Sequence, residues 1–261
     1  MEIIIQPDAD SANEVAARLL SGQLREKSAS VLGLATGNTP LGLYRLLARR
    51  HHEGTLDFSR ASSFNLDEYV GLAADHPASY ARFMRENLFS RINLPPGRCR
   101  IPDGLAENIP AHCAAYERAI LEAGGLDWQL LGLGSDGHIG FNEPGSSLAS
   151  RTRVKTLTEQ TRRDNQRYFP DGESMPHHVI TMGLATIMSS RTCVLLAFGR
   201  AKAEAVQRTV EGPVTASVPA SLLQFHPCAK IILDEDAAGL LERASYYRWT
   251  YANRPSWQSG L

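Results

Sequence analysis

The stretch from Leu130 to Pro144 reads Leu-Leu-Gly-Leu-Gly-Ser-Asp-Gly-His-Ile-Gly-Phe-Asn-Glu-Pro. It begins as a buried strand and is then interrupted by glycines, four of them in all. Glycines at this density lose too much conformational freedom on folding to belong to an ordinary strand, so we expect a tightly bent backbone. The bend would aim three polar side chains, Asp136, His138 and Glu143, at one point.

Apolar runs and helical patterns alternate along the whole chain. The runs are continuously apolar, which is typical of parallel strands covered on both faces. They span residues 3–5, 31–34, 61–66, 127–133, 193–198 and 229–233. The fold class that we expect is α/β: a three-layer αβα sandwich around a doubly wound, mostly parallel, Rossmann-like sheet.

The chain has 261 residues and shows no internal repeat or linker, so we expect a single domain over residues 1–261. Residues 145–180 are polar, and we expect them to form a mobile lid. After the last strand we expect a helix from about Ala237. The aromatic residues of the tail are Tyr246, Tyr247, Trp249, Tyr251 and Trp257.

Bulk composition argues against several classes of partner. A formal net charge of −1 gives no general attraction to nucleic acid or to an anionic membrane. No apolar stretch reaches the roughly 18–20 residues of a membrane span, and the acidic N-terminus does not resemble a signal peptide. The four cysteines are scattered, as is typical of free thiols. We therefore expect a cytoplasmic protein whose partner is a small molecule.

The loop after the strand at 31–34 has the features of an anion site. It reads Ala-Thr-Gly-Asn-Thr-Pro over residues 35–40, with Thr39 as the expected helix N-cap and Pro40 as the first helical residue. Free N–H groups and the positive helix end would both face a bound anion. A plain strand-to-helix turn is the alternative. The loop is neither a Walker loop nor a G-x-G-x-x-G dinucleotide fingerprint.

Two further strand ends carry charged side chains. Asp67 follows the run at 61–66, and Lys202 follows the run at 193–198. In a doubly wound sheet such ends converge where ligands bind, although an aspartate at a strand end is more often a helix cap or turn residue. A basic group also follows the central stretch, for which a solvated surface is the alternative: Arg151, Arg153, Lys155, Arg162, Arg163 and Arg167.

Carboxylates and a histidine beside a phosphate site suit proton transfer on a phosphorylated sugar. A base can remove a proton next to a carbonyl, and an imidazole oriented by a carboxylate can open a cyclic sugar. A metal site at Asp136, His138 and Glu143 is the weaker alternative, since no further ligand spacing supports it. A serine nucleophile is disfavoured because G-x-S-x-G is absent. The residues alone indicate no narrower function.

Several motifs resemble those of the glucosamine-6-phosphate deaminase family. They are Leu34-Ala-Thr-Gly-Asn-Thr-Pro40, Phe64-Asn-Leu-Asp-Glu-Tyr-Val-Gly-Leu72, His76-Pro-Ala-Ser-Tyr80, Gly134-Ser-Asp-Gly-His-Ile-Gly-Phe-Asn-Glu-Pro144 and Ser146-Ser-Leu-Ala-Ser-Arg-Thr-Arg153. The resemblance extends to about residue 235. It implies conversion of D-glucosamine 6-phosphate and water to D-fructose 6-phosphate and ammonia, in N-acetylglucosamine utilisation, by a hydrolase or isomerase without a cofactor.

The resemblance also implies roles for individual residues. His138 would open the pyranose ring, oriented and tuned by Asp136 and Glu143. Asp67 would move the C2 proton towards C1, giving an enolamine that leads to an imine, which water hydrolyses. The phosphate would be held by Thr36, Gly37, Asn38, Thr39, Arg167 and Lys202. Asn38 stands where a glycine is common in the family.

Some members of that family are hexamers activated by N-acetylglucosamine 6-phosphate. The resemblance therefore implies a homo-oligomer, with an allosteric phosphate site at Ser146, Arg153 and Lys155. The sequence leaves two alternative functions open. One is 6-phosphogluconolactonase, which shares the fold and a related Gly-x-Asp-Gly-His stretch but not the continuation Phe141-Asn-Glu-Pro144. The other is a non-catalytic domain that senses a sugar phosphate.

Overall fold

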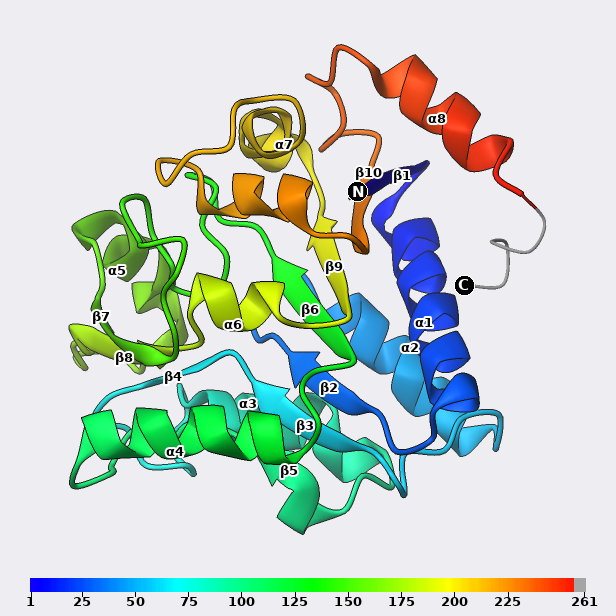
Figure 1. Ribbon diagram of the computed structural model, residues 1–261. Coiled ribbons are helices and arrows are strands. Elements are labelled where there is room, and N and C mark those ends of the chain that lie inside the picture. Colours follow the sequence, from blue (N-terminus) through cyan, green and yellow to red (C-terminus); the bar gives the residue numbers. More distant parts are fainter. Residues whose placement is uncertain (256–261) are drawn as a thin grey trace.

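A computed structural model describes residues 1–255, apart from the side chain of Asp164; residues 256–261, and with them Trp257, lie outside the described part. Its main sheet has seven strands in the order β1-β10-β9-β6-β2-β3-β5, and each neighbouring pair is parallel (Figure 1). The strands are β1 Glu2–Gln6, β2 Val31–Leu34, β3 Ser62–Asn65, β5 Cys99–Arg100, β6 Trp128–Gly132, β9 Thr192–Ala197 and β10 Ala229–Asp234.

Helices cover both faces of this sheet. The connections α1 (Ala9–Glu26), α2 (Leu41–His52) and α3 (Tyr80–Asn87) run in one direction across it. The connections through α4 (Ile109–Glu122), α6 (Leu184–Met188) and α7 (Ala203–Val210) run in the other. Right-handed crossovers then place the two sets on opposite faces, as Figure 1 shows for α1 and α2 against α4 and α6. The three-layer, doubly wound prediction is confirmed.

The strand order reverses between β2 and β6. Chain order runs outward from β2 through β3 to β5, then returns to β6 on the other side of β2 and continues through β9 to β10. Loops that leave neighbouring strands at such a reversal diverge to opposite faces and leave a crevice between them. The loops concerned begin at Ala35 and at Leu133, and both belong to the motifs that the sequence singled out.

A second, smaller sheet was not expected from the sequence. It joins β4 (Asp67–Tyr69), β8 (His178–Thr181) and β7 (Arg153–Thr156) by antiparallel pairing. The helix α5 (Glu159–Asn165) follows β7. Tyr69, Phe141 and Phe169 belong to a separate small apolar core beneath this unit. β4 begins at Asp67, so the small sheet fixes the backbone of a predicted catalytic residue.

Two expectations about helix starts were wrong. The N-cap of α2 is Pro40, with no side-chain cap bond, because Thr39 belongs to the loop that lines a cavity. Residues from Ala237 form turns because the Asp234 carboxylate accepts a bond from the Ala237 N–H and so stabilises a local turn. The remaining helical segments are α8 (Ala244–Ala252) and the short 3-10 helices η1 Phe89–Arg91, η2 Pro96–Arg98, η3 Gln166–Tyr168, η4 Arg200–Lys202 and η5 Pro219–Phe225.

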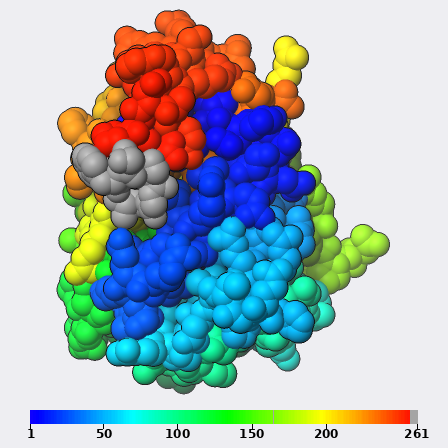
Figure 2. All heavy atoms as spheres, turned by 90° about the vertical axis from the view of Figure 1, so that its right-hand side faces the viewer, coloured from blue at the N-terminus to red at the C-terminus, as the bar shows by residue number. Residues whose placement is uncertain are grey.

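The C-terminal helix closes the fold at one edge. α8 packs against β1, and Figure 2 shows it beside the N-terminal elements. Within residues 1–255, no helix is long and apolar enough to cross a membrane.

Candidate active site

A cavity of about 810 Å³ opens at the carboxyl edge of the main sheet, where the strand order reverses. Loops after β2, β3, β6 and β9 line it together with residues of α5 and η3. It brings together these sequence-predicted residues: Thr36, Gly37, Asn38, Thr39, Asp67, His138, Arg167 and Lys202. The convergence of strand ends inferred from the sequence is therefore observed. Asp136, Glu143 and the expected allosteric residues do not line the cavity.

Asp67 is buried without a charge partner. It exposes only 5% of its surface, and none of the described cationic side chains forms an ion pair with it. Burial, and then the neighbouring charge of Glu68, raise the pKa of the Asp67 carboxyl to about 8. An aspartate with such a pKa accepts a proton readily near neutral pH, which suits a general base.

Glu68 has a different environment from its neighbour. Its carboxylate accepts hydrogen bonds from the N–H groups of Tyr80 (3.0 Å) and Ala81 (2.9 Å), in the first turn of α3. A carboxylate there is stabilised by the free N–H groups and by the helix dipole. Burial nevertheless raises the pKa of Glu68. Glu68 therefore anchors α3, while Asp67 faces the cavity.

His138 is fixed by a glycine turn and by an acid. A side-chain carbon added at Gly134 would lie 2.3 Å from the imidazole Nδ1, so the ring packs directly on the Gly134 backbone. The turn closes at Gly137, which has a φ of 87° that glycine adopts easily. His138 Nδ1 lies 2.7 Å from Asp136 Oδ1, which also accepts the His138 N–H at 3.0 Å.

The imidazole stabilises the ionised form of the Asp136 carboxyl. Partial burial raises the pKa of Asp136, but hydrogen bonds from His138 and its charge outweigh burial, so the pKa is lowered overall. Asp136 therefore stays ionised and holds Nδ1 of the ring in place. Since Nδ1 is engaged by Asp136, the other nitrogen, Nε2, is the one left to exchange a proton with a ligand.

Glu143 points elsewhere than the sequence suggested. It is buried, and its Oε1 accepts bonds from Thr158 at the backbone N–H (3.2 Å) and at the hydroxyl (3.3 Å). Thr158 is the N-cap of α5. Glu143 therefore connects the loop of His138 to the helix that precedes Arg167. A direct role beside His138 stays a prediction.

Two cationic side chains reach the cavity from different elements. Arg167 lies in η3, and its guanidinium stacks 4.9 Å from the centre of the Tyr168 ring. Lys202 ends η4, the turn that follows Gly199. The Gly199 N–H donates to both carboxylate oxygens of Asp234, at 3.0 and 2.9 Å, which holds this turn at the end of β9. Together with the N–H groups of the loop at 36–39, these cations suit an anionic ligand.

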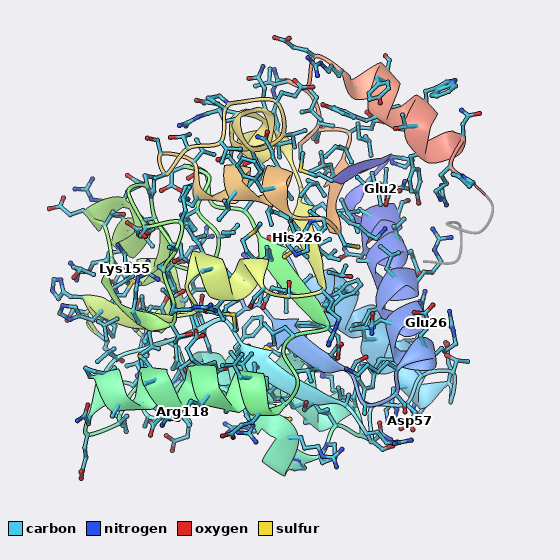
Figure 3. The ribbon with its side chains drawn as sticks, in the orientation of Figure 1. Glu2, Glu26, Asp57, Arg118, Lys155 and His226 are labelled. Atoms are coloured by element: carbon cyan, nitrogen blue, oxygen red, sulfur yellow. The ribbon has the colours of Figure 1, made fainter. Side chains whose placement is uncertain are left out.

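The expected allosteric residues lie outside the cavity. Arg153 and Lys155 are two residues apart on β7, so their side chains lie on the same face of the small sheet. Figure 3 shows Lys155 in this unit. Arg153 Nη1 donates to Asn142 Oδ1 at 2.9 Å. Ser146 is buried, and its hydroxyl has no hydrogen-bond partner among the described residues.

Sequence reasoning missed the aromatic wall of the cavity. Tyr69 and Tyr80 both line it, and their hydroxyls lie 3.1 Å apart. Tyr80 also stacks on Phe141 at an interplanar angle of 9°. In the sequence Tyr80 stood out only as the end of the motif His76-Pro-Ala-Ser-Tyr80, with no role assigned to it, and Tyr69 belongs to the unexpected small sheet.

A metal centre finds little support in the geometry. Among the described residues, no three His, Cys, Asp or Glu side chains gather as metal ligands. Asp136 and His138 meet, but Glu143 bonds Thr158 and does not join them. The donor set considered from the sequence is therefore incomplete as a site.

Comparison with known proteins assigns the family. Residues 7–232 match the family described as glucosamine-6-phosphate isomerases/6-phosphogluconolactonase. The chain belongs to this family. Two relatives within the family are named glucosamine-6-phosphate deaminase, from Arthrobacter sp. (strain FB24) and Pseudarthrobacter chlorophenolicus. They are 55% and 56% identical over 258 residues, which is 99% of this chain and 99% of each relative.

Solved structures separate the two branches of the family. A structure described as a monomeric glucosamine-6-phosphate deaminase is 44% identical, with a TM-score of 0.89, and the match covers 92% of this chain and 100% of that one. A 6-phosphogluconolactonase from Trypanosoma cruzi is 23% identical, with a TM-score of 0.75 and coverage of 92% and 97%. At that identity the lactonase shares the fold, and its likeness extends no further.

Proposed function

We propose that this protein converts D-glucosamine 6-phosphate and water to D-fructose 6-phosphate and ammonia, as an aldose-ketose isomerase and deaminase of amino-sugar catabolism. The observation that carries the proposal is the uncompensated carboxyl of Asp67, which lines the same cavity as His138 and the cationic residues. The relatives named glucosamine-6-phosphate deaminase, over 50% identical along the whole chain, support the choice of substrate.

The first step is opening of the pyranose ring. His138 would use Nε2 to transfer a proton between the C1 hydroxyl and the ring oxygen, which breaks the C1–O5 bond and leaves an aldehyde. The 2.7 Å contact of Nδ1 with Asp136 supports this role, because it fixes the ring and stabilises the protonated imidazole while it carries the proton.

The second step is movement of the C2 proton. Asp67 would remove it to give an enolamine and return it to C1, so that C2 becomes an imine. Water then adds to C2, and ammonia leaves to give the ketose. The raised pKa of Asp67 supports this role, because a carboxylate of ordinary pKa is a much weaker base.

The substrate's phosphate would lie at the opposite end of the cavity from the reacting carbons. We propose that Arg167, Lys202 and the loop of Thr36, Gly37, Asn38 and Thr39 bind it. Arginine suits this role because its planar guanidinium can donate two parallel bonds to phosphate oxygens. The reaction needs no cofactor in this scheme, since every step moves protons or water.

The reaction class is better described as isomerisation with deamination than as hydrolysis. The family description names isomerases, and the proposed scheme forms and hydrolyses an imine only as its last part. Lactone hydrolysis is disfavoured, because the lactonase relatives are about 20–23% identical and a lactonase needs no base at C2. A sensor would not need an uncompensated buried carboxyl.

Ammonia release from glucosamine 6-phosphate tests the proposal. The wild type should release ammonia and form fructose 6-phosphate in equal amounts, while the Asp67→Asn variant should bind substrate and release almost none. Hydrolysis of 6-phosphogluconolactone serves as the competing assay. An inactive wild type would sink the deaminase proposal, and a fully active variant would remove Asp67 as the base.

Several finer features belong to the same proposal. We expect a cytoplasmic enzyme with glucosamine 6-phosphate as its small-molecule partner, and the four free cysteines fit a reducing compartment. A homo-oligomer, activated through Ser146, Arg153 and Lys155, stays a prediction, and the similar structure described as monomeric argues for testing it first. Light scattering with and without N-acetylglucosamine 6-phosphate tests the oligomeric state, and kinetics under the same two conditions test the activation.

The lid is also a proposal. Segment 145–180 contacts the rim of the cavity at two points: Glu173 Oε1 lies 2.9 Å from His76 Nε2, and the Tyr168 hydroxyl accepts a hydrogen bond from Asn38. Ligand binding should then slow backbone hydrogen exchange across this segment within the single domain. Equal exchange rates with and without glucosamine 6-phosphate would contradict the lid.

A further inference from the structure

The hydroxyl of Tyr168 joins two sides of the cavity that are far apart in sequence. It accepts a hydrogen bond from Asn38 Nδ2 at 2.8 Å, across 130 residues. It accepts a second from Arg167 Nη2 at 3.0 Å, while the Arg167 guanidinium lies 4.9 Å from the centre of the Tyr168 ring. The loop after β2 is thereby linked, through one oxygen, to the guanidinium on η3.

The numbers of hydrogen-bond donors and acceptors on Arg167, Asn38 and Tyr168 match in this arrangement. A guanidinium only donates, and a tyrosine oxygen has two lone pairs, so Arg167 and the Asn38 amide occupy both acceptor positions. The hydroxyl proton then remains to be donated. Phenylalanine at 168 would keep the stacked ring but lose both bonds, and alanine at 38 would lose one of them.

Arg167 needs such support because its surroundings do little else to fix it. It is exposed, and among the described side chains no carboxylate forms an ion pair with it. An arginine side chain that rotates freely loses rotamer entropy when it binds a ligand. Orienting it in advance lowers that loss and improves affinity without any new contact to the ligand.

We propose that Asn38 and Tyr168 are positioning residues that hold Arg167 ready for the phosphate of the substrate. The inference rests on the proposed function for the identity of the ligand. It deepens that function, because it gives the Asn38 side chain a role that its backbone, as part of a phosphate loop, does not explain. Both residues act through Arg167, so neither is a catalytic residue.

The test is a cycle of variants with two readouts. Tyr168→Phe, Asn38→Ala and the double variant are compared for the KM and kcat of ammonia release and for the Kd of inorganic phosphate by calorimetry. Asn38→Ala, which loses one hydrogen bond, should raise KM and Kd roughly two- to tenfold, and Tyr168→Phe, which loses two, should raise them at least as much, with kcat within about twofold in both. The double variant should match Tyr168→Phe, because the Asn38 bond ends on the hydroxyl that this variant lacks.

An Arg167→Ala background shows whether the two residues act through the guanidinium. In that background, adding Tyr168→Phe or Asn38→Ala should not change the affinity for phosphate any further. If the two residues had a general structural role instead, each change would still lower the affinity. Tyr247→Phe is the matched control, since Tyr247 lies on α8, does not line the cavity and loses only a hydroxyl that donates to Glu211 at 3.1 Å. It should leave both constants unchanged.

Three results would overturn the proposal: unchanged or lowered KM and Kd in the single variants, additive effects in the double variant, or equal effects of Tyr247→Phe. Phosphate titration needs no turnover, so the two proposals can fail separately. If the wild type releases no ammonia while phosphate affinity falls as described, the positioning of Arg167 stands and the substrate assignment is wrong.

Discussion

Two buried aspartates lie at opposite ends of the same parallel sheet, and only one of them is neutralised. Asp127, just before β6, exposes 1% of its surface and accepts bonds from Lys27 Nζ at 2.7 Å and from the Val31 N–H at 2.8 Å; it also pairs with Arg191. Asp67, just after β3, exposes 5% and has Glu68 as its charged neighbour.

The contrast separates a residue that stabilises the fold from one that is available for chemistry. Burying an ionised carboxyl is unfavourable unless cations and N–H groups compensate it. At the amino end of the sheet the compensation is complete, and Asp127 ties α1, β2 and β9 together. At the carboxyl end of the sheet, no such groups in the described part of the chain compensate the charge of Asp67. Its pKa is therefore raised, which makes it a stronger base.

Exchanging Asp67 for asparagine should have the largest effect. Loss of a general base lowers kcat by about a thousandfold, because no other described carboxyl lines the cavity to replace it. Steady-state ammonia release measures this. Crystals or calorimetry with glucosamine 6-phosphate should show that binding survives; a variant that binds nothing would point to a structural role instead.

The same variant should gain stability with rising pH relative to the wild type. The pKa of Asp67 is higher in the folded protein than in the unfolded chain, so the neutral carboxyl favours the folded state. The wild type has this stabilisation in full below about pH 4 and loses it as the pH rises through about 8. Asparagine does not titrate. Thermal melts at pH 5 and pH 9 should therefore diverge in favour of the variant, and parallel melts would argue against a raised pKa.

Gly134→Ala tests the other half of the site. A β-carbon would sit 2.3 Å from the imidazole Nδ1, so the ring of His138 must leave its contact with Asp136. We expect kcat to fall by about a hundredfold, a typical contribution of general acid–base catalysis, with little change in melting temperature. Gly97→Ala, at a position with open space, is the matched control. Unchanged turnover in Gly134→Ala would remove the fixed-ring account.

The sequence predicted every strand of the main sheet except the two-residue β5 at its edge, and most of the cavity, for identifiable reasons. Continuous apolar runs such as the one at 193–198 are sufficient to indicate parallel strands, and their ends must converge. The partners of Glu143 and Asp127 could not be predicted, because Thr158 and Lys27 reach them through tertiary packing. The small sheet was missed because β4 and β7 are short and mixed in polarity.

Asp127→Asn should destabilise the protein without affecting catalysis. The change removes a charge that pairs with Lys27 and Arg191, and we expect a loss of about 2 kcal/mol in the free energy of unfolding, since both cations can turn to water. Urea unfolding measures the loss, and kcat at 25 °C should be unchanged. A fall in kcat would mean that the two ends of the sheet are not independent.

Glu68→Gln should produce the smallest change, a shift in pH dependence. The charge of Glu68 is the second cause that raises the pKa of Asp67, so removing it lowers that pKa. The acid limb of kcat/KM, which rises as Asp67 loses its proton, should move to lower pH. Glutamine keeps an acceptor for the Tyr80 N–H, so α3 should remain in place. If the acid limb does not move, burial alone must raise the pKa of Asp67.

The most direct test is a titration of the Asp67 carboxyl itself. In protein labelled with ¹³C at aspartate carboxyls, the resonance absent from Asp67→Asn identifies the residue, and its chemical shift follows protonation without any substrate. The account predicts a midpoint near pH 8. A midpoint near 4, the ordinary value for aspartate, would contradict an uncompensated buried base at the carboxyl end of the sheet.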